Sequence, residues 1–267
     1  MIAPLELDYE PEGLPAFDLP QELAALYPGT FGFPATRLYA NFVETLDGVV
    51  AIPSVPSSNR LIAGESAADR FVMGMLRAAA DAVVVGSGTL AAAPSSLWTP
   101  ERAYPDAARG YAQLRSRLGR KPEPELVVLT ASGHVDPHHP AIAAGALLLT
   151  TDDGAARLAP ALPDAATAVS LGKALDAAAV LDTLHERGHA SILTEGGPRV
   201  LGSLLRAGVV DELFLTLSPL LAGRPQGQER PAMVEGADLL RGGALPGGRL
   251  TGVRRDADHL FLRYSLA

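Results

Sequence analysis

The chain contains no cysteine among its 267 residues. It can therefore form no disulfide, no thiolate metal site and no cysteine nucleophile, which agrees with a reducing cytoplasm. No uninterrupted apolar run approaches the ~20 residues that a membrane-spanning helix requires. Residues 1–20 lack both a basic region and a continuous apolar region, so we expect no secretory signal.

Positive charge is scarce as well. The 22 Lys and Arg against 30 Asp and Glu give a net charge of -8, whereas non-specific binding to nucleic acid depends on basic side chains. No G-x-S-x-G motif indicates a serine nucleophile. The histidines at 134, 138 and 139 lack the spacing of a metal site, so we expect a surface loop and no metal. We expect a small-molecule substrate, and neither nucleic acid nor a membrane as a partner.

With 48% hydrophobic residues, the chain can bury the core of one large domain. Residues 1–36 are rich in Pro and Gly, with a short helical patch at 21–26, and we interpret them as an arm packed on the domain surface. A disordered tail is the alternative, although the segment is more apolar than a solvated tail needs. Residues 37–267 form the main domain, with an irregular excursion at about 91–125 that carries one helix.

One glycine turn organises the second half of the chain. A strand at 191–194 runs into Glu195-Gly196-Gly197, Pro198 suits the first position of a helix, and Gly208 ends that helix before a strand at 212–217. Such a turn leaves bare backbone N–H groups at a helix N-terminus, where phosphates bind well. In the alternative interpretation, Gly197 only caps the helix and Glu195 faces solvent.

Two other turns follow predicted strands. The strand at 37–43 leads into Thr45-Leu46-Asp47-Gly48, which alone is typical of an ordinary turn. The strand at 82–85 leads into Gly86-Ser87-Gly88-Thr89, where a dinucleotide fingerprint would need a helix of normal length that Pro94 disfavours. We therefore favour ligand contact at this turn but not a Rossmann fold.

The remaining pattern alternates strands with helices. Ser66-Ala67-Ala68-Asp69 is a variant of the capping box that precedes a helix, and residues 53–60 are predicted to be a loop. The other predicted elements are strands at 126–130 and 146–150, a helix at 175–187, and closing strands at 249–254 and 260–266. This order predicts an α/β fold with a mainly parallel central sheet, an antiparallel C-terminal edge and helices on both faces.

Several of these motifs, taken in order, resemble the riboflavin-pathway pyrimidine reductases, the RibD C-terminal domain family of the dihydrofolate-reductase-like superfamily. The resemblance runs from about residue 37 to the C-terminus. It rests on the turn at 45–48, Asp69-Arg70, Leu76-Arg77, residues 81–89, residues 195–198, residues 210–213 and residues 218–223.

The resemblance implies a homodimer that binds NADPH across the carboxyl ends of the strands and passes hydride to the ribosyl carbon of a phosphoribosylaminopyrimidine. Thr45 through Ala51 would lie against the nicotinamide, and Thr130 and Ser132 would meet the adenosine 2′-phosphate. The other implied coenzyme residues are Gly86, Ser87, Gly88, Thr89, Gly196, Gly197 and Arg199.

The implied catalytic groups are Asp47 and Glu195, and the implied substrate residues are Asn41, Arg60 and Arg70. Arg77 is a further cation for a substrate phosphate, or alternatively a surface helix residue.

The chain departs from the family where it has Asn41 for a lysine, Leu61 for a tryptophan and Ala92-Ala93 for an acidic pair. These departures leave two alternatives open. One is a reductase of another small heterocycle such as dihydrofolate, and the other is a non-catalytic NADPH-binding protein.

Overall fold

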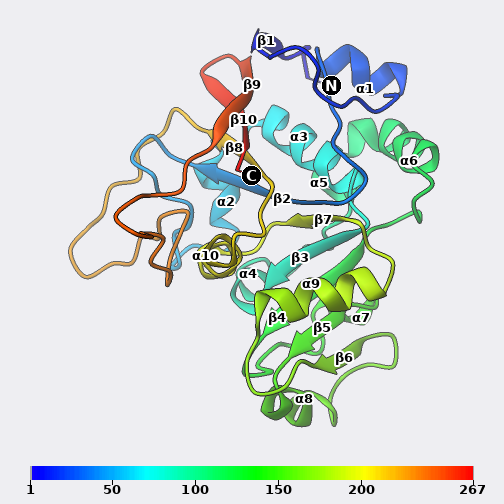
Figure 1. Ribbon diagram of the computed structural model, residues 1–267, viewed down its shortest axis with the longest axis vertical. Helices are drawn as coiled ribbons and strands as arrows, with labels where there is room; N and C mark the ends of the chain where they lie inside the picture. The colour runs from blue at the N-terminus through cyan, green and yellow to red at the C-terminus, as the bar shows by residue number, and fades with distance from the viewer. Residues whose placement is uncertain (1, 267) are drawn as a thin grey trace.

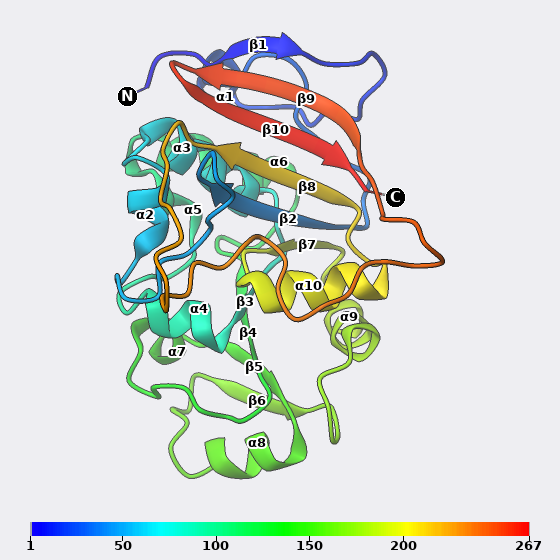
Figure 2. The same ribbon diagram turned by 90° about the vertical axis from the view of Figure 1, so that its left-hand side faces the viewer.

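Strand β2 (Arg37–Glu44) lies in the middle of a ten-stranded sheet (Figure 1). The structure is a computed structural model that describes residues 2–266. Seen from the side in Figure 2, the strands follow the order β1-β9-β10-β8-β2-β7-β3-β4-β5-β6. From β8 to β6 in this order, each strand is parallel to the next, which confirms the predicted mainly parallel sheet.

The parallel strands bring their carboxyl ends to one edge of the sheet. Their bounds are β3 (Ala82–Gly86), β4 (Glu125–Thr130), β5 (Leu147–Thr150), β6 (Thr167–Ser170), β7 (Ser191–Thr194) and β8 (Glu212–Leu217). On β2, residues 37–40 pair with β7, and residues 39–44 pair with β8. Because β7 and β8 lie on opposite sides of β2, helix α10 (Pro198–Ala207), which joins them, crosses over β2.

The antiparallel edge consists of three strands. Strand β10 (His259–Ser265) pairs with β8 and with β9 (Arg249–Asp256), as the closing pattern predicted. Strand β1 (Glu6–Tyr9), which the pattern did not predict, pairs with β9 and forms the outermost strand. The first residues of the described chain therefore complete the sheet.

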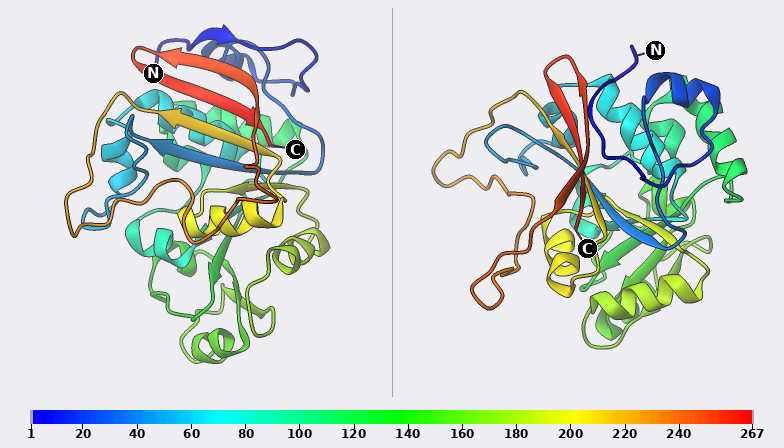
Figure 3. Two further views of the ribbon diagram at one scale, coloured as in Figure 1. Left: turned by 60° about the vertical axis from the view of Figure 1, so that its left-hand side comes forward. Right: turned by 45° about the horizontal axis from the view of Figure 1, so that its top comes forward.

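Helices cover both faces of the sheet (Figure 3, right). Alternating side chains of β2 divide the core, because Tyr39 packs with helix α3 (Ala67–Ala78), whereas Leu38 packs with α10 and α9 (Ala177–Glu186). Helix α6 (Ala108–Arg117) and helix α1 (Gln21–Leu26), which was predicted at these residues, lie on the α3 face. None of the helices in residues 2–266 is long and apolar enough to cross a membrane.

The N-terminal arm packs against the domain within residues 2–36. Leu23, Phe31 and Phe33 are buried in the core on the α3 face. Arg254 of β9 holds the arm, because its guanidinium donates to the carbonyl oxygen of Pro28 at 2.9 Å and lies over the ring of Tyr27. These contacts describe a packed segment and not a disordered tail.

Several short helices differ from the expectation. The predicted loop at 53–60 contains the start of α2 (Ser58–Ile62), and the excursion carries α5 (Pro100–Ala103) and a 3₁₀ turn, η1 (Pro105–Ala107), besides α6. The other short helices are α4 (Ser87–Ala92), α7 (Pro140–Ala143) and α8 (Asp152–Leu158). Four- to seven-residue helices carry too little periodicity to stand out in a sequence.

Candidate functional site

The glycine turn after β7 has the predicted form. Gly197 is the N-cap of α10, Pro198 is its first residue, and Gly208 ends it in the left-handed region at φ 71°. A Cβ at Gly196 would lie 2.6 Å from Cγ1 of Val200, and one at Gly197 would lie 3.1 Å from Oγ1 of Thr89. The turn therefore needs its glycines, and it abuts the turn that follows β3.

The turn after β3 opens a short helix. Helix α4 begins at Ser87, immediately after the strand, and ends at Ala92, two residues before Pro94. A fingerprint helix of normal length is absent here, as predicted. The space beside Gly88 is open, since among the described residues no atom lies within 4 Å of the point that a Cβ would occupy, apart from its chain neighbours and the backbone of α4. A ligand can approach this backbone closely.

Glu195 and Arg77 form a buried ion pair beneath the glycine turn. Nε of Arg77 donates to Oε1 of Glu195 at 2.8 Å, and Nη2 donates to Oε2 at 2.6 Å. Their side chains are only 8% and 10% exposed. The surface interpretation of Arg77 and the solvent-facing alternative for Glu195 are therefore both wrong, because each charge neutralises the other inside the protein. Nη1 of Arg77 also donates to the carbonyl oxygen of Thr99, so its guanidinium is not free to meet a substrate phosphate.

Asp47 joins its turn to the loop after β8. Its carboxylate accepts hydrogen bonds from the Thr45 hydroxyl (2.6 Å) and from the backbone N–H groups of Ala222 (3.0 Å) and Gly223 (2.8 Å). The Thr45 hydrogen bond, followed by those from the backbone, lowers the pKa of Asp47 to about 2. Asp47 is consequently an anion near neutral pH and cannot supply a proton there.

The predicted substrate residues lie on two elements. Arg60 and Arg70 both contact Glu65, Arg60 through its carboxylate and Arg70 through its backbone oxygen, so two guanidinium groups meet at the turn between α2 and α3. The Arg60–Glu65 pair is 61% exposed on both sides. Asn41 is half-buried on the α3 side of β2, and within residues 2–266 its side-chain amide makes no hydrogen bond. Two cations near the strand ends suit a phosphate group.

The turn after β4 changes one coenzyme assignment. Thr130 is only 2% exposed, and its hydroxyl accepts a hydrogen bond from the backbone N–H of Gly133, so this side chain is not available to a 2′-phosphate. Ser132 is exposed, and Nε of Arg157 donates to its carbonyl oxygen at 3.0 Å. Sequence reasoning missed Arg157 because it did not predict α8, which carries this side chain beside Ser132.

Two further residues that the resemblance assigns to the coenzyme lie near the same edge. Ala51 is half-buried beyond the Thr45–Gly48 turn, and Arg199 is exposed in the first turn of α10. Arg199 lies 3.8 Å from the position of a Cβ on Gly236, in the long loop between β8 and β9. That loop and the first turn of α10 therefore lie side by side.

The histidine loop is structural. His134 and His138 are exposed as expected, but His139 is buried. Its Nδ1 accepts a hydrogen bond from the N–H of Ala141 at the start of α7. Trp98 is buried and packs against His139, with ring centroids 6.1 Å apart, as its packing interpretation predicted. Among residues 2–266, no three His, Asp or Glu side chains group to hold a metal ion.

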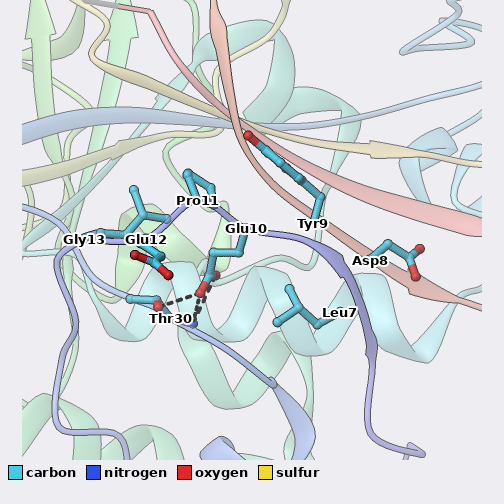
Figure 4. Close-up of a pocket in the computed structure, with 9 residues that line it drawn as sticks. Leu7, Asp8, Tyr9, Glu10, Pro11, Glu12, Gly13 and Thr30 are labelled. Atoms are coloured by element: carbon cyan, nitrogen blue, oxygen red, sulfur yellow. Dashed lines mark hydrogen bonds between the residues drawn. The ribbon is translucent and has the colours of Figure 1, made fainter.

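A cavity of ≈ 510 Å³ lies at the N-terminal arm (Figure 4). The carboxylate of Glu10 points at Thr30 there, and it accepts the Thr30 N–H at 2.9 Å and the hydroxyl at 2.6 Å. Burial alone would raise the pKa of Glu10, but hydrogen bonds from Thr30 and Arg254 lower it overall. This carboxylate fastens the arm, and the cavity contains none of the predicted site residues.

Comparison with known proteins agrees with the geometry. The family described as RibD C-terminal domain matches residues 36–255. A relative named 2,5-diamino-6-ribosylamino-4(3H)-pyrimidinone 5′-phosphate reductase, from Archaeoglobus fulgidus, is 24% identical over 210 residues, which cover 76% of this chain and 88% of the relative.

Two solved structures share the fold. A pyrimidine reductase-like protein from Corynebacterium diphtheriae has a TM-score of 0.65 and 21% identity, covering 87% of this chain and 92% of that one. A diaminohydroxyphosphoribosylaminopyrimidine deaminase/5-amino-6-(5-phosphoribosylamino)uracil reductase from Thermotoga maritima has a TM-score of 0.61 and 20% identity. The match covers 87% of this chain but only 57% of the Thermotoga chain.

Proposed function

This chain belongs to the RibD C-terminal domain family of oxidoreductases, and we propose that it uses NADPH to reduce the ribosyl carbon of a phosphoribosylaminopyrimidine in riboflavin biosynthesis. The observation that carries the proposal is the meeting of two glycine turns, at residues 86–89 and 195–197, at the carboxyl edge of the sheet. Ligands of open α/β sheets bind at that edge. A division into an accessory arm (1–36) and a reductase domain (37–267) belongs to the same proposal.

The coenzyme assignment follows the strand ends. The turns at 86–89 and 196–197 would hold the pyrophosphate, aided by Arg199, while residues 45–51 would lie against the nicotinamide. Ser132 and Arg157 would bind the 2′-phosphate, because a guanidinium is the group best suited to a doubly charged phosphate. Thr130 would support this turn from below.

The substrate would lie between α2, α3 and the ends of β2 and β8. Arg60 and Arg70 would bind its phosphate, and the free amide of Asn41 would donate to or accept from the pyrimidine. When bound, NADPH supplies the hydride. The protein would hold the nicotinamide carbon that gives the hydride in line with the ribosyl carbon that accepts it. Such positioning lowers the activation free energy of the transfer substantially.

Asp47 and Glu195 are the acidic groups that we assign nearest the reacting carbon. As an anion, Asp47 would stabilise the cationic, imine-like form of the ribosylamine that accepts hydride. Glu195, held by Arg77, would fix the glycine turn relative to α3. Both roles are electrostatic and need no proton donated by either carboxyl group.

The test is a pair of measurements. NADPH binding, followed by fluorescence titration, examines the coenzyme assignment, and its absence would overturn it. NADPH oxidation is then followed with a phosphoribosylaminopyrimidine and with dihydrofolate side by side. Oxidation with the pyrimidine supports the proposal, whereas oxidation with dihydrofolate alone makes the chain a reductase of another heterocycle.

We also propose a homodimer that acts in the cytoplasm. Leu46, Leu61 and Leu221 are exposed near the proposed substrate site, and a second subunit would cover such apolar side chains. A charged coenzyme and a phosphorylated substrate do not cross membranes unaided, so an enzyme that uses both is expected where they are made. Light scattering of the purified protein tests the dimer.

A further inference from the structure

Asp69 is a buried carboxyl group that helix capping does not explain. It occupies the third position of α3, where a capping-box side chain would bond back to the N–H of Ser66. That N–H instead bonds to the carbonyl oxygen of Ala63. Ser66 caps the helix through the N–H of Asp69, so the box is only half formed. The carboxyl group of Asp69 is left to serve another purpose.

Asp69 lies on α3 one turn before Val72, which lines a small cavity together with Asn41 of β2 and Thr216 of β8. Thr216, His259, Glu195 and Arg70 are the polar or charged groups within electrostatic range of its carboxyl group. Asp69 is 6% exposed, and burial raises its pKa. Within residues 2–266 it forms no ion pair. A buried carboxyl group has several acceptor positions, which proteins rarely leave unmet.

Its surroundings contain two more unused polar groups. The ring of Tyr39 lies on the α3 side of β2, since its hydroxyl donates to the carbonyl oxygen of Leu76, and Asn41 follows on the same side. Ser218 continues the β8 ladder through its N–H to Glu44, on the side of Thr216, and in the described chain its buried hydroxyl has no partner. The otherwise apolar interface between α3 and the sheet thus carries a cluster of polar residues near the carboxyl ends of β2 and β8. The cluster consists of Asn41, Asp69, Thr216 and Ser218.

We propose that Asp69 recognises the pyrimidine ring of the substrate and selects a ring with a 2-amino group over one with a 2-oxo group. This inference rests on the proposed function. At the C2–N3 edge, opposite the ribosylamino carbon, a 2-aminopyrimidinone presents two parallel N–H donors, which match the two oxygens of a carboxylate. A uracil presents a carbonyl oxygen in place of one donor, which would face the carboxylate lone pairs. The chain should therefore use the substrate named for the Archaeoglobus relative in preference to the uracil of the Thermotoga protein.

The isosteric substitution Asp69→Asn provides the test. An amide accepts from N3–H with its oxygen and donates to a 2-oxo group with its nitrogen, so it suits the uracil. We measure binding of both phosphoribosylaminopyrimidines to the NADP⁺-saturated protein by calorimetry, and kcat/KM for each with NADPH. Wild type should favour the 2-amino substrate roughly 10²-fold, and Asp69→Asn should reverse the preference. Asp182→Asn, exposed on α9, is the matched control and should leave the ratio unchanged.

The outcomes separate the two proposals. Equal binding of both rings by wild type, or the same ratio in Asp69→Asn, overturns the role of Asp69. Preferential binding without reduction overturns the proposed function but supports Asp69, and binding of neither ring overturns both. If Asp69→Asn does not fold, Thr216→Val decides the matter, because loss of this polar neighbour of the carboxyl group should lower the ratio about tenfold. An unchanged ratio in that variant refutes the inference.

Discussion

Removal of either partner of the Arg77–Glu195 ion pair should destabilise the protein strongly. We consider Arg77→Met, Glu195→Gln and the double variant. The side chains are 8% and 10% exposed, so solvent screens them little, and each single variant leaves one charge buried without its partner. Such an unpaired buried charge costs about 3–5 kcal/mol, a large share of the ~5–15 kcal/mol that stabilises a typical domain.

The double variant distinguishes pairing from simple loss of packing. It leaves no buried charge, so it should be more stable than the sum of the single variants predicts, with a coupling of roughly 2–3 kcal/mol. Urea unfolding followed by Trp98 fluorescence measures the three free energies. Trp98 is the only tryptophan, is buried, and precedes Thr99, whose carbonyl oxygen Arg77 also contacts. Single-variant effects that add within ~0.5 kcal/mol would refute the reasoning.

An exposed pair provides the control for this cycle. Arg109 contacts Glu22 at 3.3 Å with 80% of its side chain exposed, so Arg109→Met should change stability by at most ~1 kcal/mol. The same proteins also test function, because the glycine turn next to Glu195 is a proposed coenzyme site. NADPH affinity should fall in both single variants and stay unchanged in Arg109→Met.

Three further predictions concern the strand ends. The folded pKa of Asp47, about 2, lies below its ordinary value of 3.8, so its stabilisation is present above pH ~4 and is lost as the pH falls towards 2; the melting-temperature gap between wild type and Asp47→Asn should close over that range. Arg157→Ala should raise the KM for NADPH roughly 10- to 100-fold and leave that for NADH unchanged, in steady-state assays. Gly196→Ala should cost about 1–3 kcal/mol in urea unfolding, because its Cβ meets α10 at 2.6 Å, whereas Gly88→Ala should cost little.

Each of these has a contradicting result. A melting-temperature gap for Asp47→Asn that is as wide at pH 2 as at pH 6 would show that its carboxylate does not hold the loop. Equal losses for NADPH and NADH in Arg157→Ala would remove it from the 2′-phosphate site, with exposed Arg206→Ala as the control. Unaltered NADPH affinity in Gly196→Ala would separate that turn from the coenzyme.

Local signals predicted the parts of the fold that depend on neighbouring residues. Helix α10 begins at Pro198 and ends before Gly208, because proline suits the first helical position and a left-handed residue ends a helix. The short apolar runs of β3 and β7 predicted buried parallel strands from local sequence alone. In the structure every residue of both strands is buried. These elements needed no knowledge of their partners.

Elements that depend on distant partners escaped prediction. All four residues of β1 are exposed, so no apolar alternation indicates a strand, and only its pairing with β9 orders them. Strand β6 is half-exposed at the other edge of the sheet. Arg77 lies on a helix and Glu195 in a turn, and nothing near either residue indicates that each is the partner of the other. The site was therefore predictable in its turns but not in its ion pairs.

The position of β2 governs the order in which the chain can fold. Strands β3 to β6 follow one another in sequence and pair as neighbours, so these four of the ten strands can pair while the rest of the chain is still being synthesised. Strand β2, built from residues 37–44, has to wait for both of its neighbours, from residues 191–194 and 212–217. Until then both of its edges are open to pairing with other chains. Non-local pairing of this kind slows folding, so the turn that carries Asp47 at the end of β2 is fixed only after most of the chain has been made.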